Sequence, residues 1–220
     1  MKAKFGAKFE QSDLVALSVI AGTAALTGAL YARLPERIPR HFDIHGVADG
    51  WTSRSLGAWL LPLTAVGLWI LLRPGALLLP SAWRARMDQS PTAQVTALVA
   101  ILMSSLQCVM LYSALQQPES VGTLHGLLLG AFWLGLGLIL PRVRRNPWMG
   151  VRTPWTLSSD ENWARTHRIA GYTFVIAGAL AVLGTLITQS AALGIALILA
   201  SGLIPVVYSF LLARRLPPEA

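Results

Sequence analysis

Four side chains that could carry acid–base chemistry lie in two polar loops of this chain. His41 and Asp49 belong to the first loop, and Glu161 and His167 belong to the second. Histidines and carboxylates are the groups that general acid–base catalysis uses most often. However, neither loop contains a nucleophile–base pair or a metal motif of recognised spacing. We therefore favour a non-enzymatic protein over a membrane enzyme, and we expect no catalytic residues and no cofactor.

The first loop, residues 35–55, also holds side chains of the types that bind divalent metals. The donors would be His41, Asp43, His45 and Asp49, since imidazole and carboxylate suit zinc. Nearby proline and glycine make a helical pair of ligands doubtful, and the loop has no cysteine. We therefore expect no metal site here, and we favour a folded surface loop in which His41 hydrogen-bonds to the backbone.

The second loop, residues 141–168, concentrates more unusual residue types than any other segment. It reads NPWMGVRTPWTLSSDENWARTH from residue 146 to residue 167. The prolines after Asn146 and Thr153 favour extended or turn steps, and Gly150 permits a backbone conformation that other residues resist. One explanation of this loop is purely structural. In it, three tryptophans insert beneath the lipid headgroups, and the arginines, Arg142, Arg144 and Arg145 among them, bind the headgroup phosphates.

A helix is predicted to begin near Ser159. Ser158 and Glu161 have the spacing of an S-x-x-E capping box, and the acidic residues fall in the first turn, where the helix dipole favours them. Glu161 and Arg165 are spaced as an i, i+4 ion pair. Trp163, His167 and Ala170 would share one face. No helix breaker follows, so the helix should continue into the next apolar block.

Six apolar blocks must position these loops. The chain has 220 residues, 54% of them hydrophobic and 13% charged, whereas soluble domains carry about 25% charged residues. Each block is long enough to cross about 30 Å of hydrocarbon, where only helices satisfy the backbone of such segments. The predicted spans are Leu14–Leu34, Leu56–Leu79, Val95–Leu115, Val121–Leu140, Ile169–Ile187 and Ala191–Leu212. We therefore expect an all-α membrane protein with six transmembrane helices and two ordered polar loops.

The second span is the weakest, because Arg73 and Pro74 interrupt it. Arg73 is expected to snorkel to the interface and to leave Gly75–Leu79 in a half-buried turn. Apart from Arg73, the span interiors carry no Lys, Arg, Asp or Glu. Proton-coupled transport usually needs such groups at membrane depth, so the sequence argues against it.

Two spans carry small or polar residues suited to helix packing. In span 3, Gln107 is expected to hydrogen-bond between helices, as are its neighbours Ser104, Ser105 and Cys108. Span 4 is expected to pack closely on a neighbour through its glycines, which are Gly126, Gly130, Gly135 and Gly137.

The basic residues predict an orientation. The net charge is +8, but the arginines and lysines are spread over short loops, so we exclude a nucleic-acid partner. Fourteen of the eighteen fall on one side of the six-span topology, among them Lys2, Lys4 and Lys8. The first block is too long for a typical signal peptide, so it is predicted to be an uncleaved span. Both termini should therefore be cytoplasmic, with residues 35–55 outside.

The two polar loops resemble each other. Aligned on their glycines, GVADGWTSRS (Gly46–Ser55) and GVRTPWTLSS (Gly150–Ser159) agree at five of ten positions. Each follows the first span of a three-span half, and the halves start on opposite sides of the membrane. We therefore divide the chain into residues 1–120 and 121–220, and put forward an inverted three-plus-three repeat as a hypothesis. A chance match of short loops is the alternative.

The second loop resembles the signature loop of the SdpI family of bacterial membrane proteins. Residues matching the pattern N-x-x-x-G-x-R-T-P-W-T, followed by a Trp and a Thr-His, are Asn146, Gly150, Arg152, Thr153, Pro154, Trp155, Thr156, Trp163 and His167. The first loop, PERIPRHFDIHGVADGW, resembles a domain of unknown function that often precedes the SdpI region. His41, Gly46 and Asp49 fall on its typical positions.

The resemblance implies a function and a set of binding residues. The family is known for immunity to a secreted peptide toxin and, in its founding case, for tethering a transcriptional repressor at the membrane. The implied partners are the lipid bilayer, an extracellular peptide toxin and a cytoplasmic regulator, in the bacterial inner membrane. The alternative is a small-molecule or lipid transporter built on the inverted repeat. Candidate binding residues are those of the matched pattern together with Glu161, His41, Phe42, Gly46, Asp49 and Trp51.

Overall fold

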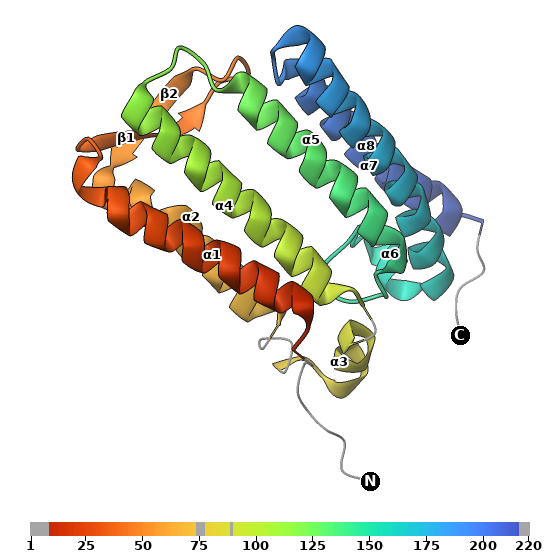
Figure 1. Ribbon diagram of the computed structural model, residues 1–220. Helices are drawn as coiled ribbons and strands as arrows, with labels where there is room; N and C mark the ends of the chain where they lie inside the picture. Colours follow the sequence, from red (N-terminus) through yellow and green to blue (C-terminus); the bar gives the residue numbers. More distant parts are fainter. Residues whose placement is uncertain (1–8, 74–77, 89, 216–220) are drawn as a thin grey trace.

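Six long helices dominate the computed structural model, which describes residues 9–73, 78–88 and 90–215. Within those residues, six helices are long and apolar enough to cross a bilayer (Figure 1), so the predicted six-span architecture is confirmed, although the second helix ends at Leu72 and not at Leu79 as predicted. They are α1 (Gln11–Leu30), α2 (Arg54–Leu72), α4 (Thr92–Gln116), α5 (Gly122–Ile139), α7 (Asp160–Thr188) and α8 (Ala192–Ala213). Lys2, Lys4 and Lys8, which contribute to the predicted orientation, lie outside the described residues.

Shorter elements connect the spans. A 3-10 turn (Tyr31–Arg33) ends the first span, and another (Leu140–Arg142) ends the fourth. The helices between spans are α3 (Ser81–Asp88) and α6 (Pro154–Ser158). In the first loop, β1 (Arg37–Phe42) pairs antiparallel with β2 (Ala48–Ser53). The folded surface loop predicted there therefore contains a β-hairpin.

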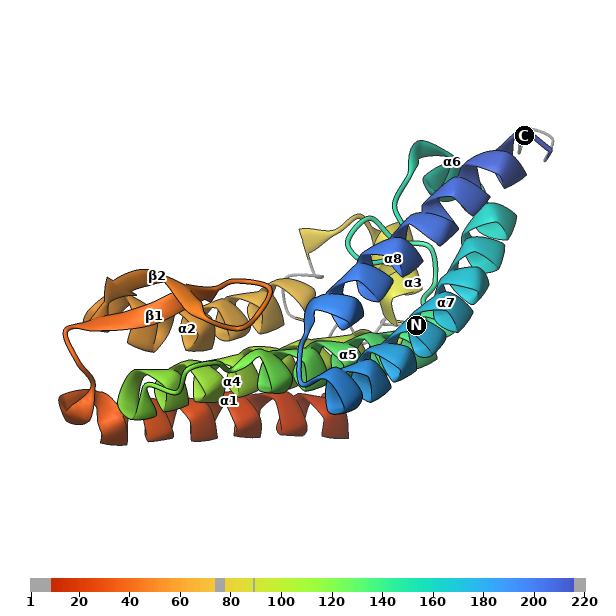
Figure 2. The ribbon, with the colours of Figure 1, turned by 90° about the horizontal axis from the view of Figure 1, so that it is seen from above.

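The helices form two groups of three. In the first group α4 packs against both α1 and α2, and in the second α7 packs against both α5 and α8. The groups meet where α4 contacts α5. Figure 2 shows α2 with the hairpin on the same side of the α4–α5 layer as α8, and α1 on the opposite side. The hairpin, α2 and α8 therefore flank a common space above α4 and α5.

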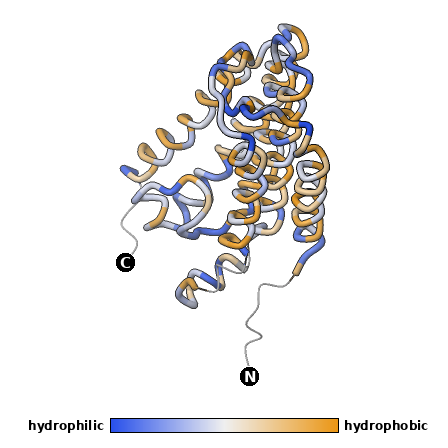
Figure 3. The backbone as a smooth tube through the Cα atoms, turned by 90° about the vertical axis from the view of Figure 1, so that its left-hand side faces the viewer, coloured by the Kyte–Doolittle hydropathy of each residue, from blue (hydrophilic) through white to orange (hydrophobic). Residues whose placement is uncertain are grey.

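The molecule has two distinct ends. The hairpin end contains β1, β2 and the turns after α4 and α7. The loop end contains the second loop, α3, the start of α1 and the end of α8 (Figure 1). Hydrophobic residues follow the helices, while many hydrophilic ones gather in the connections (Figure 3). The first helix therefore starts, and the last helix finishes, at the loop end, as an even number of spans requires.

Gln107 joins the three helices of the first group. Its side chain is fully buried, and its Nε2 donates to the carbonyl oxygen of Ala58 on α2 at 2.9 Å and to Thr27 Oγ1 on α1 at 3.4 Å. The predicted interhelical hydrogen bonds of Gln107 are confirmed. Ser104, Ser105 and Cys108 instead line a lateral groove beside α1.

Glycines bring α5 and α7 into backbone contact. A Cβ atom at Gly130 would lie 3.1 Å from the carbonyl oxygen of Gly178, and one at Gly137 would lie 2.7 Å from the backbone nitrogen of Val175. Close approach of this kind requires small residues, so the packing role predicted for the glycines of span 4 is confirmed. Gly135 differs, because it faces Leu98 of α4.

The prediction that Arg73 snorkels to the interface was wrong. The α2 helix ends at Leu72, and Arg73 is only 8% exposed. Its Nη2 and Nε donate to the two carboxylate oxygens of Asp13 at 2.6 and 2.7 Å, and Trp69 Nε1 donates to the same carboxylate at 3.2 Å. Asp13 lies inside the first turn of α1, so a second charged residue belongs to the spans. Of the turn predicted from residue 75, residues 75–77 lie outside the described residues.

The two halves of the proposed repeat pack differently. The central helix is the third span in the first half and the second span in the other half. The aligned glycines do share a left-handed conformation, with φ of +77° at Gly46 and +112° at Gly150. After them, however, one loop forms β2 and the other forms α6. The repeat and the division at residue 120 stay predictions from the sequence.

Candidate functional site

The tip of the hairpin is fixed to the turn between α4 and α5. The backbone N–H of Val121 donates to the carbonyl oxygen of Gly46 at 2.9 Å, and Ser120 Oγ donates to that of His45 at 2.5 Å. A Cβ atom at Gly46 would lie 2.0 Å from the backbone nitrogen of Gly122. Only glycine fits there, because the backbone is left-handed and the space is filled.

Asp43 shapes the hairpin tip. Its Oδ1 accepts hydrogen bonds from the backbone N–H groups of His45 and Val47, at 2.8 and 2.9 Å. The Val47 N–H is the largest influence that lowers the pKa of the Asp43 carboxyl below its ordinary value. This arrangement is the Asx-type turn that aspartate favours in tight loops.

His41 pairs with a side chain and not with the backbone as predicted. Its Nδ1 lies 2.5 Å from Asp49 Oδ1, across the two strands and exposed to solvent. Among the described residues, no three His, Cys, Asp or Glu side chains gather as a metal site would require. Asp49 therefore pairs with His41, while Asp43 accepts backbone hydrogen bonds in the turn.

A pocket of about 330 Å³ opens beside the hairpin, in the space that the hairpin, α2 and α8 flank. Its lining residues include His41, Phe42 and Gly46 of the hairpin, and the Phe42 ring lies 4.8 Å from the ring of His125 on α5. Apolar side chains from four helices form its walls, including Leu61, Met110, Leu129 and Ile195. We call this the hairpin pocket. Of the first-loop candidates, Asp49 and Trp51 do not line it.

Asn146 organises the second loop. Its fully buried amide accepts from the backbone N–H groups of Trp148 and Met149 and donates to the carbonyl oxygens of Arg144 and Met149. All four contacts are with the backbone of the loop itself. A fully used, buried amide is a structural element of the loop, because no group is left to bind a partner.

His167 is buried beneath the same loop. Its Nε2 accepts from the backbone N–H of Val151 at 3.1 Å, so its Nδ1 carries the proton and donates to the carbonyl oxygen of Trp163 at 2.8 Å. The rings of His167 and Trp163 stack with their centroids 4.1 Å apart. Trp163 Nε1 donates to the carbonyl oxygen of Val143 at 2.7 Å. The predicted shared face is confirmed, since Trp163, His167 and Ala170 are all buried.

The N-terminal caps of α6 and α7 involve other residues than the Ser158–Glu161 box that the sequence predicted. Ser159 caps α7, accepting from the N–H of Asn162, so the predicted start is confirmed. Ser158 instead donates to the carbonyl oxygen of Trp155, so the predicted S-x-x-E box does not form. The reciprocal box belongs to Thr153 and Thr156 on α6. It formed there because Pro154 makes Thr153 the natural helix start.

The remaining candidates of the second loop point in different directions. Trp155 Nε1 donates to Ser209 Oγ on α8 at 2.7 Å. Arg152 is exposed and donates to the carbonyl oxygen of Pro147, while Glu161 pairs with Arg165 on the outside of α7. The matched loop is therefore a folded cap over the start of α7, and these side chains do not meet in one cavity.

The loop end also has a pocket, which the sequence did not predict as a site. It has a volume of about 870 Å³ and lies between α3, residues 141–145 after α5 and the start of α7. We call it the arginine pocket, because its charged lining residues are Arg86, Arg142, Arg144, Arg145 and Asp160. The clusters WRAR (83–86) and PRVRR (141–145) were the available signal. Their convergence depends on tertiary structure.

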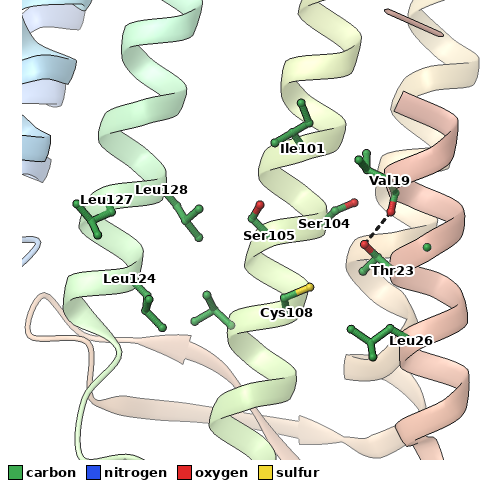
Figure 4. Close-up of a pocket in the computed structure, with 12 residues that line it drawn as sticks. Val19, Thr23, Leu26, Ile101, Ser104, Ser105, Cys108, Leu124, Leu127 and Leu128 are labelled. Carbon is green, nitrogen blue, oxygen red and sulfur yellow. Dashed lines mark hydrogen bonds between the residues drawn. The ribbon is translucent and has the colours of Figure 1, made fainter. Parts of the chain in front are cut away.

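A third cavity, the lateral groove of about 600 Å³, lies along α4 between α1 and α5 (Figure 4). Leucines and other apolar side chains line most of it. Thr23 satisfies its hydroxyl locally by donating to the carbonyl oxygen of Val19 at 2.7 Å. The polar lining residues of the groove are Thr23, Ser104, Ser105 and Cys108.

Two family models match the chain. Residues 142–209 match the SdpI/YfhL protein family, and residues 19–66 match a domain of unknown function, DUF1648. No curated protein and no solved structure matches it. The first match covers the second loop, α6, α7 and most of α8, and the second covers most of α1, the hairpin and much of α2. Both resemblances noted in the sequence are thereby confirmed: the chain is a multi-pass membrane protein whose residues 142–209 match the SdpI/YfhL family and whose residues 19–66 match DUF1648.

Proposed function

We propose that this protein is a non-enzymatic immunity or sensor protein of the bacterial inner membrane. In this proposal it engages a secreted peptide toxin at its hairpin end, outside the cell, and a transcriptional regulator at its loop end, in the cytoplasm. The orientation follows from the excess of Lys and Arg at the loop end. Reporter fusions at residues 118 and 150 test it, since the first should report from outside and the second from the cytoplasm.

The hairpin pocket is the observation that carries the proposal. Its lining is mostly apolar, with a few polar side chains such as Arg40, His41 and Asp43, which suits one anchoring side chain of a peptide. The sheet has only two strands within the described chain, so each has an edge without a strand partner. Extended peptides bind such edges through main-chain hydrogen bonds. The fixed hairpin tip holds both features in place before binding, which lowers the entropic cost of association.

The loop end supports an interaction with a folded partner. Buried hydrogen bonds of Asn146, His167 and Trp163 hold the second loop in one conformation. Charged side chains are exposed on that rigid base, Arg152 and Glu161 among them. Membrane co-sedimentation of cytosolic transcription factors, with and without Arg152→Glu, measures this part of the proposal.

The test of immunity compares cells with and without the protein against a panel of secreted peptide toxins. We expect protection by the wild-type chain and loss of protection by Phe42→Ala and His125→Ala, each of which removes a ring that lines the hairpin pocket. Leu63→Ala is the matched control, because Leu63 is 65% exposed on α2 and does not line the pocket. Equal membrane levels are checked by immunoblot. If no toxin in the panel separates the two strains, the immunity proposal fails.

A further inference from the structure

We propose that the arginine pocket is a binding site for a phosphate-bearing anion, a role that goes beyond peptide recognition at the hairpin end. Four guanidinium groups and one carboxylate line it, those of Arg86, Arg142, Arg144, Arg145 and Asp160. This leaves a surplus of positive charge within one cavity of about 870 Å³. Arginine is the side chain best matched to phosphate, because its planar fork donates two parallel hydrogen bonds.

The pocket is held in shape before any ligand enters. The backbone N–H of Arg144 donates to Ser90 Oγ at 3.0 Å, and Ser90 Oγ donates to the carbonyl oxygen of Arg86 at 2.9 Å. The carbonyl oxygen of Val143 accepts from Trp163 Nε1. These contacts join α3, the end of α5 and the start of α7 around the cavity. A preformed cavity binds more tightly than one that must assemble.

Asp160 occupies part of the positive surface. Arg86 donates to its two carboxylate oxygens at 2.6 and 3.1 Å, and Arg145 Nε lies 2.7 Å from Oδ1. One carboxylate is therefore shared by two guanidinium groups. Asp160 is 56% exposed, so an incoming anion can reach the same groups and compete with it. We call Asp160 the internal competitor.

Arg142 and Arg144 are the groups open to a ligand. Both are exposed, and within the described part of the chain neither guanidinium has an ion-pair partner. They flank Val143, directly after the apolar run of α5. The pocket would therefore meet either the phosphate of an anionic lipid headgroup or a soluble phosphate. The chemistry that recognises the two is the same.

The test uses the full-length protein in lipid nanodiscs and has two arms. In the first, nanodiscs of neutral phosphatidylcholine are titrated with inorganic phosphate and pyrophosphate by calorimetry. In the second, native mass spectrometry measures phosphatidylglycerol retained by the protein from mixed nanodiscs. Saturable binding in the first arm identifies a soluble ligand, and selective retention in the second identifies a lipid headgroup. Either supports the site, and failure of both overturns it.

Three variants separate the pocket from general surface charge. Arg142→Gln with Arg144→Gln should weaken binding about tenfold or more, as loss of charge-assisted hydrogen bonds predicts. Asp160→Asn should strengthen it several-fold, because two guanidinium groups lose their internal competitor. Arg152→Gln is the matched control, since Arg152 lies in the same loop but does not line the pocket. Equal weakening by Arg152→Gln, or no tightening by Asp160→Asn, would overturn the assignment. Thermal unfolding of each variant confirms that it is folded.

Discussion

The Nε2 atom of His167 fills the space that a side chain on residue 150 would need. A Cβ atom built on Gly150 would lie 2.2 Å from Nε2, and the backbone there has φ of +112°. The next residue, Val151, donates its N–H to the same nitrogen. Gly150 and His167, 17 residues apart, therefore lie in direct contact, and this contact holds the second loop against α7.

Replacing Gly150 with alanine should therefore destabilise the protein. We expect a loss of about 2 kcal/mol or more in unfolding free energy, from backbone strain and the clash with His167. Denaturant unfolding in detergent micelles measures it. Gly202→Ala is the control, because a Cβ atom there meets nothing within 4 Å and alanine is the better helix former. Equal stabilities of the two variants would contradict the close contact.

Neutralising Asp13 should be costly, because it leaves the guanidinium of Arg73 without its closest partner in a buried site. We expect Asp13→Asn to lower the unfolding free energy by about 3–5 kcal/mol. Replacing the pair together, as Asp13→Leu with Arg73→Met, should recover much of the loss. The exposed pair Glu161–Arg165 is the matched comparison, and Glu161→Gln should cost less than about 0.5 kcal/mol. Similar losses for the two single variants would contradict a buried pair.

Gly46→Ala should release the hairpin tip from the α4–α5 turn, because no Cβ atom fits beside the backbone of Gly122. Hydrogen exchange at the Val121 N–H, which donates to the Gly46 carbonyl oxygen, should become faster. Protection against a toxin, where the wild-type chain provides it, should decrease in parallel. Gly67→Ala on α2 should change neither, since nothing lies within 4 Å of its Cβ position.

The turn at Asp43 should open in acid. Its folded pKa is lowered, chiefly by the hydrogen bond from the Val47 N–H, from an ordinary value of about 3.9. The carboxylate's contribution is therefore present above that ordinary value and is lost as the pH falls through the lower, folded pKa. Hydrogen exchange at His45 and Val47 should accelerate only in that acid range. Asp43→Asn keeps a carbonyl acceptor that does not titrate, so its exchange should lack this additional acid dependence.

Local sequence patterns were sufficient for much of the architecture. Length and hydropathy predicted six spans because a bilayer imposes the same requirement on every span, whatever its neighbours. The spacing of Trp163, His167 and Ala170 predicted a shared face because the helix period is fixed. Gln107 was recognised as a link between helices, since a lone amide in an apolar span needs a partner.

Other features depend on which helices are neighbours, and only the tertiary structure decided them. Asp13 and Arg73 are 60 residues apart, so their pairing appears only when α1 lies against the end of α2. Arg86 and Asp160 are 74 residues apart, and the arginine pocket forms where α3 meets α7. The cap at Thr153 prevailed over the one predicted at Ser158, because Pro154 favours a separate helix before α7. A membrane span can be predicted from the hydropathy of one segment alone. Charge pairing, capping and pocket formation depend on contacts between segments.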